Sequence, residues 1–148
     1  MMSVLPLKNR WQRILIGGMS LLVLAFVYIF QGWFGEFFAS SSLGAEARFV
    51  ANRLTRFLLN DMACLALIAA VFNESRYVRL AWFVFLFELL IILPFYFVVK
   101  LLLEGDSEIS SPLLSQIHRM IVNPLLMLAL MAGIVYQHAR ERRGEKLG

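Results

Sequence analysis

The chain has 148 residues, of which 60% are hydrophobic, 14% aromatic and only 16% charged. A soluble domain of this length has too small an interior for so much apolar side chain, so the excess is expected to face the membrane lipid bilayer. The formal net charge is +4, but the basic residues flank apolar runs, which favours a role in topology and argues against a nucleic-acid partner.

The first apolar run predicts a membrane span over about residues 14–33, preceded by Lys8, Arg10 and Arg13. A signal peptide also combines a basic start with an apolar stretch. The nearest small-x-small triplet, Ala45-Glu46-Ala47, lies well past the apolar core, whereas cleavage usually occurs close to it. We therefore expect a retained helix.

A second span is predicted over about residues 50–72. Its most apolar part, residues 57–72, is short against the ~20 residues that cross a bilayer and is interrupted by Asn60 and Asp61. The upstream extension adds Asn52, Arg53 and Arg56. Long arginine side chains near a helix end can extend to the lipid headgroups, so the span is compatible with these residues near one membrane surface.

A short polar link at residues 73–76 predicts a tight connection to a third span over about residues 78–99, which contains Glu88 and Pro94. Residues 100–111 are expected to form an acidic loop.

Ser111 and Pro112 are a favourable helix start, because serine caps a helix and proline suits its first turn. A fourth span is predicted from there over about residues 113–136 and contains Asn123 and Pro124. Residues 137–148 are expected to be a polar, frayed tail.

The distribution of lysine and arginine predicts the orientation of the four spans. With the N-terminus in the cytoplasm, nine basic residues lie on the inner side: Lys8, Arg10, Arg13, Arg76, Arg79, Arg140, Arg142, Arg143 and Lys146. Five lie on the outer side: Arg48, Arg53, Arg56, Lys100 and Arg119. We therefore predict an all-α fold, a single membrane domain over residues 1–148 that forms an integral membrane bundle of four transmembrane helices with both termini cytoplasmic.

The polar residues of the second span gather on one side of the predicted helix. At 100° per residue, Asn52, Arg53, Arg56 and Asn60 fall within about 100° of one face, with Asp61 roughly 80° further round. Asp61 and Glu88 lie at similar heights in their spans, near the middle of the bilayer. Three interpretations stay open: these groups fix helix packing, they form a docking surface for another membrane protein, or they line an ion or substrate pathway.

Catalysis and metal binding are not expected. Cys64 lies in the inner half of the second span and His118 at the outer entrance of the fourth, roughly 20 Å apart in depth, whereas a Cys–His pair needs contact near about 3 Å. No HExxH motif or ligand-spaced carboxylate cluster occurs. We expect no cofactor, and the chain is predicted not to be an enzyme.

Several runs resemble a known family. The run from Asn52 to Asp61, NRLTRFLLND, is similar to the second-span motif of the small exosortase F system-associated membrane proteins of Bacteroidetes. Ile117-His118-Arg119, residues 122–125 (VNPL) and Tyr136-Gln137 resemble the last span of that family. The chain departs from the family after the first span, where Trp33-Phe34-Gly35-Glu36 replaces an aromatic-Asp-Pro turn.

The resemblance implies a non-catalytic accessory protein of an exosortase-type protein-sorting system, multi-pass in the bacterial inner (cytoplasmic) membrane, with an exosortase as partner. Exosortases are membrane cysteine transpeptidases, but the residues around Cys64 do not resemble the catalytic site of that family. The positions that match the family motifs, or that the spans single out for interaction or helix packing, are Asn52, Arg53, Arg56, Asn60, Asp61, Glu88, Arg119, Asn123 and Pro124.

An alternative from another functional class is a small transporter or channel subunit. Asp61 and Glu88 would carry protons or cations in that case, because ionisable groups inside a membrane often mark ion pathways.

Overall fold

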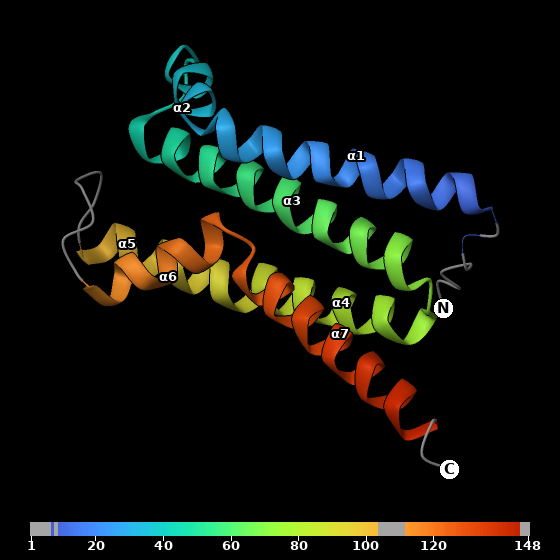
Figure 1. Cartoon of the computed structure of the whole chain (residues 1–148). Helices are drawn as coiled ribbons and strands as arrows, with labels where there is room; N and C mark the ends of the chain where they lie inside the picture. Colours follow the sequence, from blue (N-terminus) through green and yellow to red (C-terminus); the bar gives the residue numbers. More distant parts are fainter. Residues whose placement is uncertain (1–6, 8, 104–111, 146–148) are drawn as a thin grey trace.

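The computed structural model describes residues 7, 9–103 and 112–145, which form helices and no strand (Figure 1). In chain order the elements are α1 (Arg10–Ile29), α2 (Gln31–Ala39), α3 (Ala45–Phe72), α4 (Ser75–Phe87), the π-helical turn η1 (Glu88–Ile92), α5 (Leu93–Leu103), α6 (Pro112–Val122) and α7 (Leu125–Glu145). The all-α prediction is confirmed for these residues.

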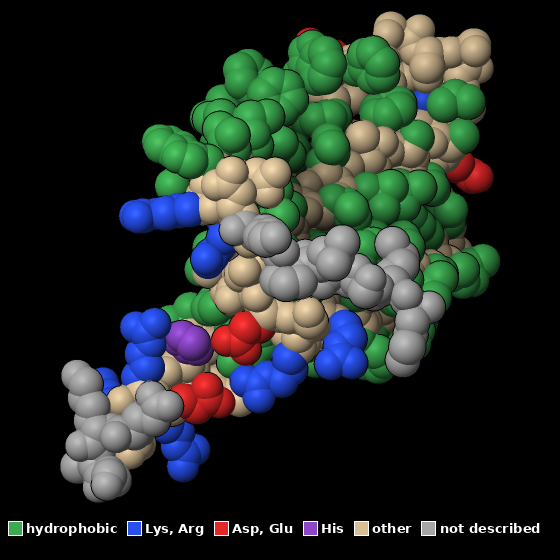
Figure 2. Space-filling model, turned by 90° about the vertical axis from the view of Figure 1, so that its right-hand side faces the viewer, with side chains coloured by type: hydrophobic (Ala, Val, Ile, Leu, Met, Phe, Trp, Pro, Cys, Tyr) green, Lys and Arg blue, Asp and Glu red, His purple; other side chains and the backbone are tan. Residues whose placement is uncertain are grey.

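The exterior of the helices is strongly apolar. Leu22, Phe83 and Leu90 expose 64%, 70% and 67% of their surface. Figure 2 shows hydrophobic side chains over most of the upper part of one face, with charged groups gathered below. Soluble monomers rarely expose such continuous apolar surface. Three segments, α1, α3 and α4 to α5, are long and apolar enough to cross a membrane, and a fourth is added if α6 and α7 count as one bent span.

The first helix differs from the predicted span at both ends. Asn9 caps α1 by accepting a hydrogen bond from the Trp11 backbone N–H, so the helix starts at Arg10. At Phe30 the backbone leaves helical geometry, with ψ of 26°, and Trp33 belongs to the separate helix α2. The 20 residues of α1 span about 30 Å, which matches the thickness of a bilayer core.

Helix α3 is the centre of the molecule, since α1, α2, α4, α6 and α7 all pack against it. It starts five residues before the predicted span and ends at Phe72, as predicted. Its contact with α1 is antiparallel: the Arg13 Nε donates to the Ala70 carbonyl over 2.9 Å, and a Cβ added at Gly17 would lie 3.7 Å from the Ala70 Cβ.

The predicted tight link after α3 is confirmed. Asn73 adopts the left-handed conformation, with φ of 52°, and α4 begins at Ser75. The Asn73 Oδ1 accepts a hydrogen bond from the Leu7 backbone N–H over 2.6 Å. This turn therefore holds Leu7 against the α3–α4 connection, and we call this part of the molecule the turn end.

The π-helical turn was not predicted, and it changes which residues face inward. The Leu93 N–H donates to the Glu88 carbonyl, one residue further back than in an α-helix. In an uninterrupted α-helix Glu88 and Lys100 would point about 120° apart. The wide turn absorbs roughly one residue and brings them within about 20°, and both are buried.

The fourth predicted span, residues 113–136, is broken into two helices that meet at 59°. Pro124 has no N–H to donate to the carbonyl of Met120, and the Leu125 N–H turns to the Asn123 carbonyl over 2.6 Å. The fourth apolar segment is therefore a bent span, and Pro124 is the physical reason for the bend.

Two further boundaries differ from the prediction. Helix α7 continues to Glu145, so most of the tail expected to fray is helical. The Arg76 Nη2 lies 3.6 Å from the Glu141 Oε1, which places this part of α7 beside the start of α4 at the turn end. Helix α5 continues to Leu103 and includes Lys100, while the rest of the predicted acidic loop, residues 104–111, lies outside the described residues.

The close approach of α1 and α3 generates a stability prediction. A leucine at Gly17 would press against Ala70 and Leu67, whereas a Cβ at Gly18 meets nothing within 4 Å. We expect Gly17→Leu to lower the free energy of unfolding by about 1–3 kcal/mol relative to Gly18→Leu, measured by SDS titration in detergent micelles. Both variants gain the same helix propensity, so equal stabilities would contradict the packing of α1 on α3.

Candidate functional site

The predicted polar residues divide into enclosed and exposed groups. Arg56, Asn60, Asp61 and Glu88 are buried, with 6%, 5%, 1% and 3% of their surface exposed. Asn52, Arg53 and Pro124 are half-buried, and Arg119 and Asn123 are exposed. The residues of α3 share one side of the helix as predicted, but other helices cover that side.

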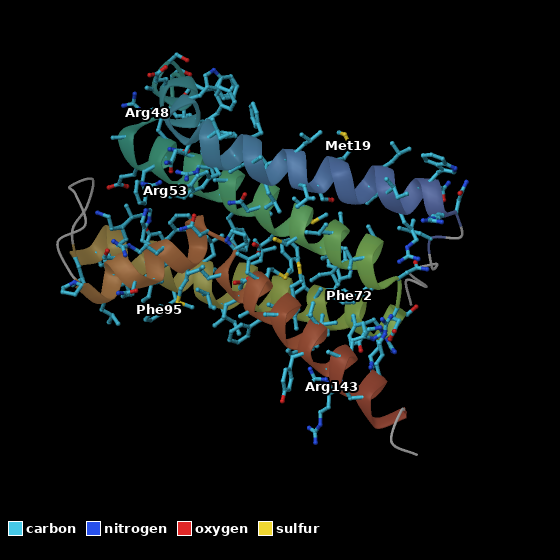
Figure 3. All side chains as sticks on the ribbon, in the orientation of Figure 1. Met19, Arg48, Arg53, Phe72, Phe95 and Arg143 are labelled. Atoms are coloured by element: carbon cyan, nitrogen blue, oxygen red, sulfur yellow. The ribbon has the colours of Figure 1, made fainter. Side chains whose placement is uncertain are left out.

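A cluster of cations lies at the end of the bundle opposite the turn end. The Arg53 guanidinium and the Lys100 ammonium lie 5.4 and 5.6 Å from the centre of the Phe49 ring, in cation–π geometry. Phe49 in turn meets the ring of Phe97, 6.3 Å away. Figure 3 shows Arg53 near the start of α3, above α5 and α6.

His118 joins this cluster from α6. Its Nδ1 lies 2.9 Å from the hydroxyl oxygen of Tyr96, which is fully buried. Four cations act on the imidazole by charge, namely Arg53, Arg56, Lys100 and Arg119. We call Arg53, Arg56, Lys100 and His118 the basic cluster.

The basic cluster contains residues that the sequence analysis missed. Lys100 was assigned to a loop, and neither Tyr96 nor Phe49 was singled out. The buried positions of this segment are Glu88, Leu93, Tyr96 and Lys100. The π-helical turn η1 shifts the inward face, which is why Tyr96 and Lys100 were not predicted to face the core. A five-residue step between Glu88 and Leu93 is longer than an α-helix allows on one face.

A pair of carboxyl groups lies deeper between α3 and η1. The side chains of Asp61 and Glu88 are within hydrogen-bonding reach of each other, which confirms that they share a level. In the part of the chain that the structure describes, no N–H or O–H donor reaches Asp61 Oδ1, Asp61 Oδ2 or Glu88 Oε2. A carboxylate has no hydrogen to donate, so this contact becomes a hydrogen bond only when the pair holds a proton.

Aromatic and apolar side chains enclose the carboxyl pair. The rings of Phe57 and Phe85 stack with centres 6.1 Å apart, one turn away from Asp61 and Glu88 along their helices. Cys64 is fully buried, and it lies close enough to both carboxyl groups to interact with them electrostatically. Asp61 and Glu88 expose almost none of their surface, and the low dielectric of such an interior strengthens electrostatic interactions.

A cavity of about 360 Å³ opens where α6 and α7 break apart. Its polar lining comes from Arg56, Asn60 and Asn123, and its apolar lining from α1 and α7. We call it the lateral cavity, and Figure 1 shows the α6–α7 junction that borders it lying beside α3. The structure thus brings four predicted residues together here: Arg56, Asn60, Asn123 and Pro124.

A second hollow of about 420 Å³ lies between α1 and α3, and we call it the α1–α3 groove. Ser20, Ala63 and Ala66 are among its lining residues, and Met19 and Met62 are 59% and 44% exposed at its rim. The Ser20 hydroxyl donates to the Ile16 carbonyl over 2.7 Å, so it presents no unsatisfied polar group. The groove is apolar, and its three small residues lie among larger side chains such as Leu15, Leu59 and Met62.

No group of three or more His, Cys, Asp or Glu side chains that could hold a metal ion occurs within residues 9–103 and 112–145. The charged groups near Cys64 are the carboxyls of Asp61 and Glu88, whereas the charged groups near His118 are cations. The two candidate catalytic residues thus belong to different clusters.

Comparison of the chain with protein-family models, with curated proteins and with solved structures gives no match.

The carboxyl pair generates a second stability prediction. Asp61→Ala leaves Glu88 buried without its neighbour and is expected to lower the free energy of unfolding by about 1–3 kcal/mol. Glu88→Ala should act similarly. The double variant should lose less free energy of unfolding than the sum of the two single losses, by on the order of 0.5–3 kcal/mol. SDS titration of the wild type and the three variants measures the difference. Additive losses would contradict a direct contact between the two groups.

Proposed function

We propose that this chain is a non-catalytic accessory subunit that binds another membrane protein through the α1–α3 groove. The groove is the observation that carries the proposal. Helices associate in a membrane mainly through close packing, which small residues allow, and Ser20, Ala63 and Ala66 line the groove on two neighbouring helices. A transmembrane helix of a partner is the occupant that fits this shape and chemistry.

The burial of the polar residues supports an accessory role. Arg56, Asn60 and Asp61 are buried within the bundle, so too little of their surface is exposed to dock another protein. The contact surface proposed here is therefore the apolar side of α3 that faces the groove. The exosortase resemblance, which rests on the Asn52–Asp61 run and the motifs of the last span, suggests an exosortase as the partner.

We further propose a multi-pass location in the bacterial inner membrane with both termini in the cytoplasm. Arg13, Arg76 and the arginines near the end of α7 gather at the turn end, which fits a cytoplasmic location for that end. A cysteine at position 143 should then react with a membrane-impermeant maleimide only after the cells are opened. Labelling in intact cells would show that this end faces the outside and would contradict the proposed orientation.

The groove proposal predicts a selective loss of partner binding. In Ala66→Phe a large ring fills the groove, so recovery of a co-expressed exosortase in mild detergent should fall about tenfold, as for an interface residue worth about 1.4 kcal/mol. Quantitative immunoblotting of the purified complex measures the loss.

Ala129→Phe makes the same change at an exposed position of α7, away from the groove, and serves as the control. It should leave the recovered complex unchanged. Equal recovery with Ala66→Phe and wild type would rule out the groove as the contact surface, and no complex with the wild-type chain would rule out an exosortase partner.

A second function is favoured by the contact between Asp61 and Glu88. Two carboxyl groups in contact inside an apolar layer resemble the arrangement that proton pathways use. The π-helical turn at Glu88 adds support, because such turns often occur at functional sites. In this second proposal the chain is a small transporter or channel subunit.

Flux measurements separate the two functions. If the carboxyl pair conducts, liposomes that contain the purified chain should show proton or cation uptake under a gradient, and Asp61→Asn should abolish it because the amide cannot ionise. Arg143→Gln, at the exposed end of α7, should leave the flux intact. Absence of flux under every gradient would eliminate this candidate.

A further inference from the structure

The lateral cavity has one polar and one apolar side. Arg56 and Asn60 contribute from α3, whereas Leu24, Val27 and Leu128 contribute from α1 and α7. Its volume of about 360 Å³ lies in the range of small-molecule sites. A ligand that fits both sides must be amphiphilic.

Arg56 is the charged group in this lining, and it is 94% buried. Its Nη2 donates to the Gln31 Oε1 over 3.2 Å, and its Nε has no hydrogen-bond partner within the described ranges. A guanidinium carries five N–H donors, and among the described residues the buried Nε–H of Arg56 has no acceptor. A buried donor without an acceptor is unfavourable, and the cavity supplies room for one.

The charge around Arg56 calls for an anion. Arg53 acts on it with the same sign, and none of the described acidic side chains lies within 4 Å of either arginine. A planar guanidinium binds phosphate or carboxylate through two parallel hydrogen bonds, which a lysine cannot imitate.

The height of Arg56 in the bundle identifies the source of that anion. Its hydrogen-bond partner Gln31 lies just beyond the end of α1, whose length of about 30 Å equals the thickness of the bilayer core. With α1 across the bilayer core, Arg56 lies in the outer half of that core, where a long arginine side chain can reach lipid headgroups. The cavity also borders the apolar exterior, because Tyr28, Leu125 and Leu128 are 72%, 43% and 45% exposed.

We propose that the lateral cavity binds an anionic phospholipid, with its phosphate on Arg56 and one acyl chain between α1 and α7. Asn123 offers an amide donor to the ester and phosphate oxygens, and Leu24, Val27 and Leu128 contact the chain. The inference rests on the membrane location proposed above but not on the protein partner.

The full chain, purified in detergent, is titrated with phosphatidylglycerol or phosphatidylcholine of identical acyl chains, and bound lipid is counted by native mass spectrometry. We expect phosphatidylglycerol to bind about tenfold more tightly. Arg56→Gln should remove this preference, Arg56→Lys should keep part of it, and Arg143→Gln, an exposed cation on α7, should leave it intact (Figure 3). Leu128→Trp, which fills the cavity from its exposed rim, should reduce the binding of both lipids and tests the site should Arg56→Gln fail to fold.

Three results would overturn the proposal. Arg56→Gln with an unchanged preference excludes this arginine, and an equal loss in Arg143→Gln reduces the effect to general surface charge. Displacement of phosphatidylglycerol by millimolar inorganic phosphate alone would identify a small-anion site without a lipid chain. Because no partner protein is present, failure here leaves the docking proposal standing, and failure of docking leaves this result unaffected.

Discussion

The structure depends on the enclosure of the polar groups of α3 within an otherwise apolar molecule. An unpaired charge at the centre of a bilayer is unfavourable by about 2.5–3.5 kcal/mol, so a helix that carries Asp61 is stable in a membrane only if protein surrounds that group. Helix α3 lies at the centre and is covered by α1, α2, α4, α6 and α7. Its arginines lie against aromatic rings and polar side chains, and its aspartate lies against Glu88.

Two irregularities in the surrounding helices serve this enclosure. The π-helical turn rotates the second half of the third apolar segment relative to the first half. As a result Glu88 contacts Asp61, while Lys100 joins the basic cluster and Tyr96 contacts its His118. The break at Pro124 turns α6 across α3 and α5, which carries His118 to Tyr96. Each irregularity gives up regular helical hydrogen bonds and gains contacts for groups that would otherwise lack partners.

The same packing leaves two hollows of different chemistry on different parts of the molecule. The α1–α3 groove is apolar, with Ser20, Ala63 and Ala66 among its lining residues, which suits a partner helix, whereas the lateral cavity presents a buried arginine, which suits an anionic lipid. The two proposed ligands do not compete for the same residues.

The sequence by itself determined the helical class, the apolar spans, the end of α3 at Phe72 and the turn at Asn73, because hydropathy and local backbone preferences decide these features. The shared face of Asn52, Arg53, Arg56 and Asn60 also followed from helical periodicity. Only the tertiary structure decided what covers that face, how η1 brings Lys100 inward, and how far Pro124 bends the last span. These outcomes depend on contacts between helices distant in sequence, and a periodic pattern read along one helix carries no information about the neighbour that it meets.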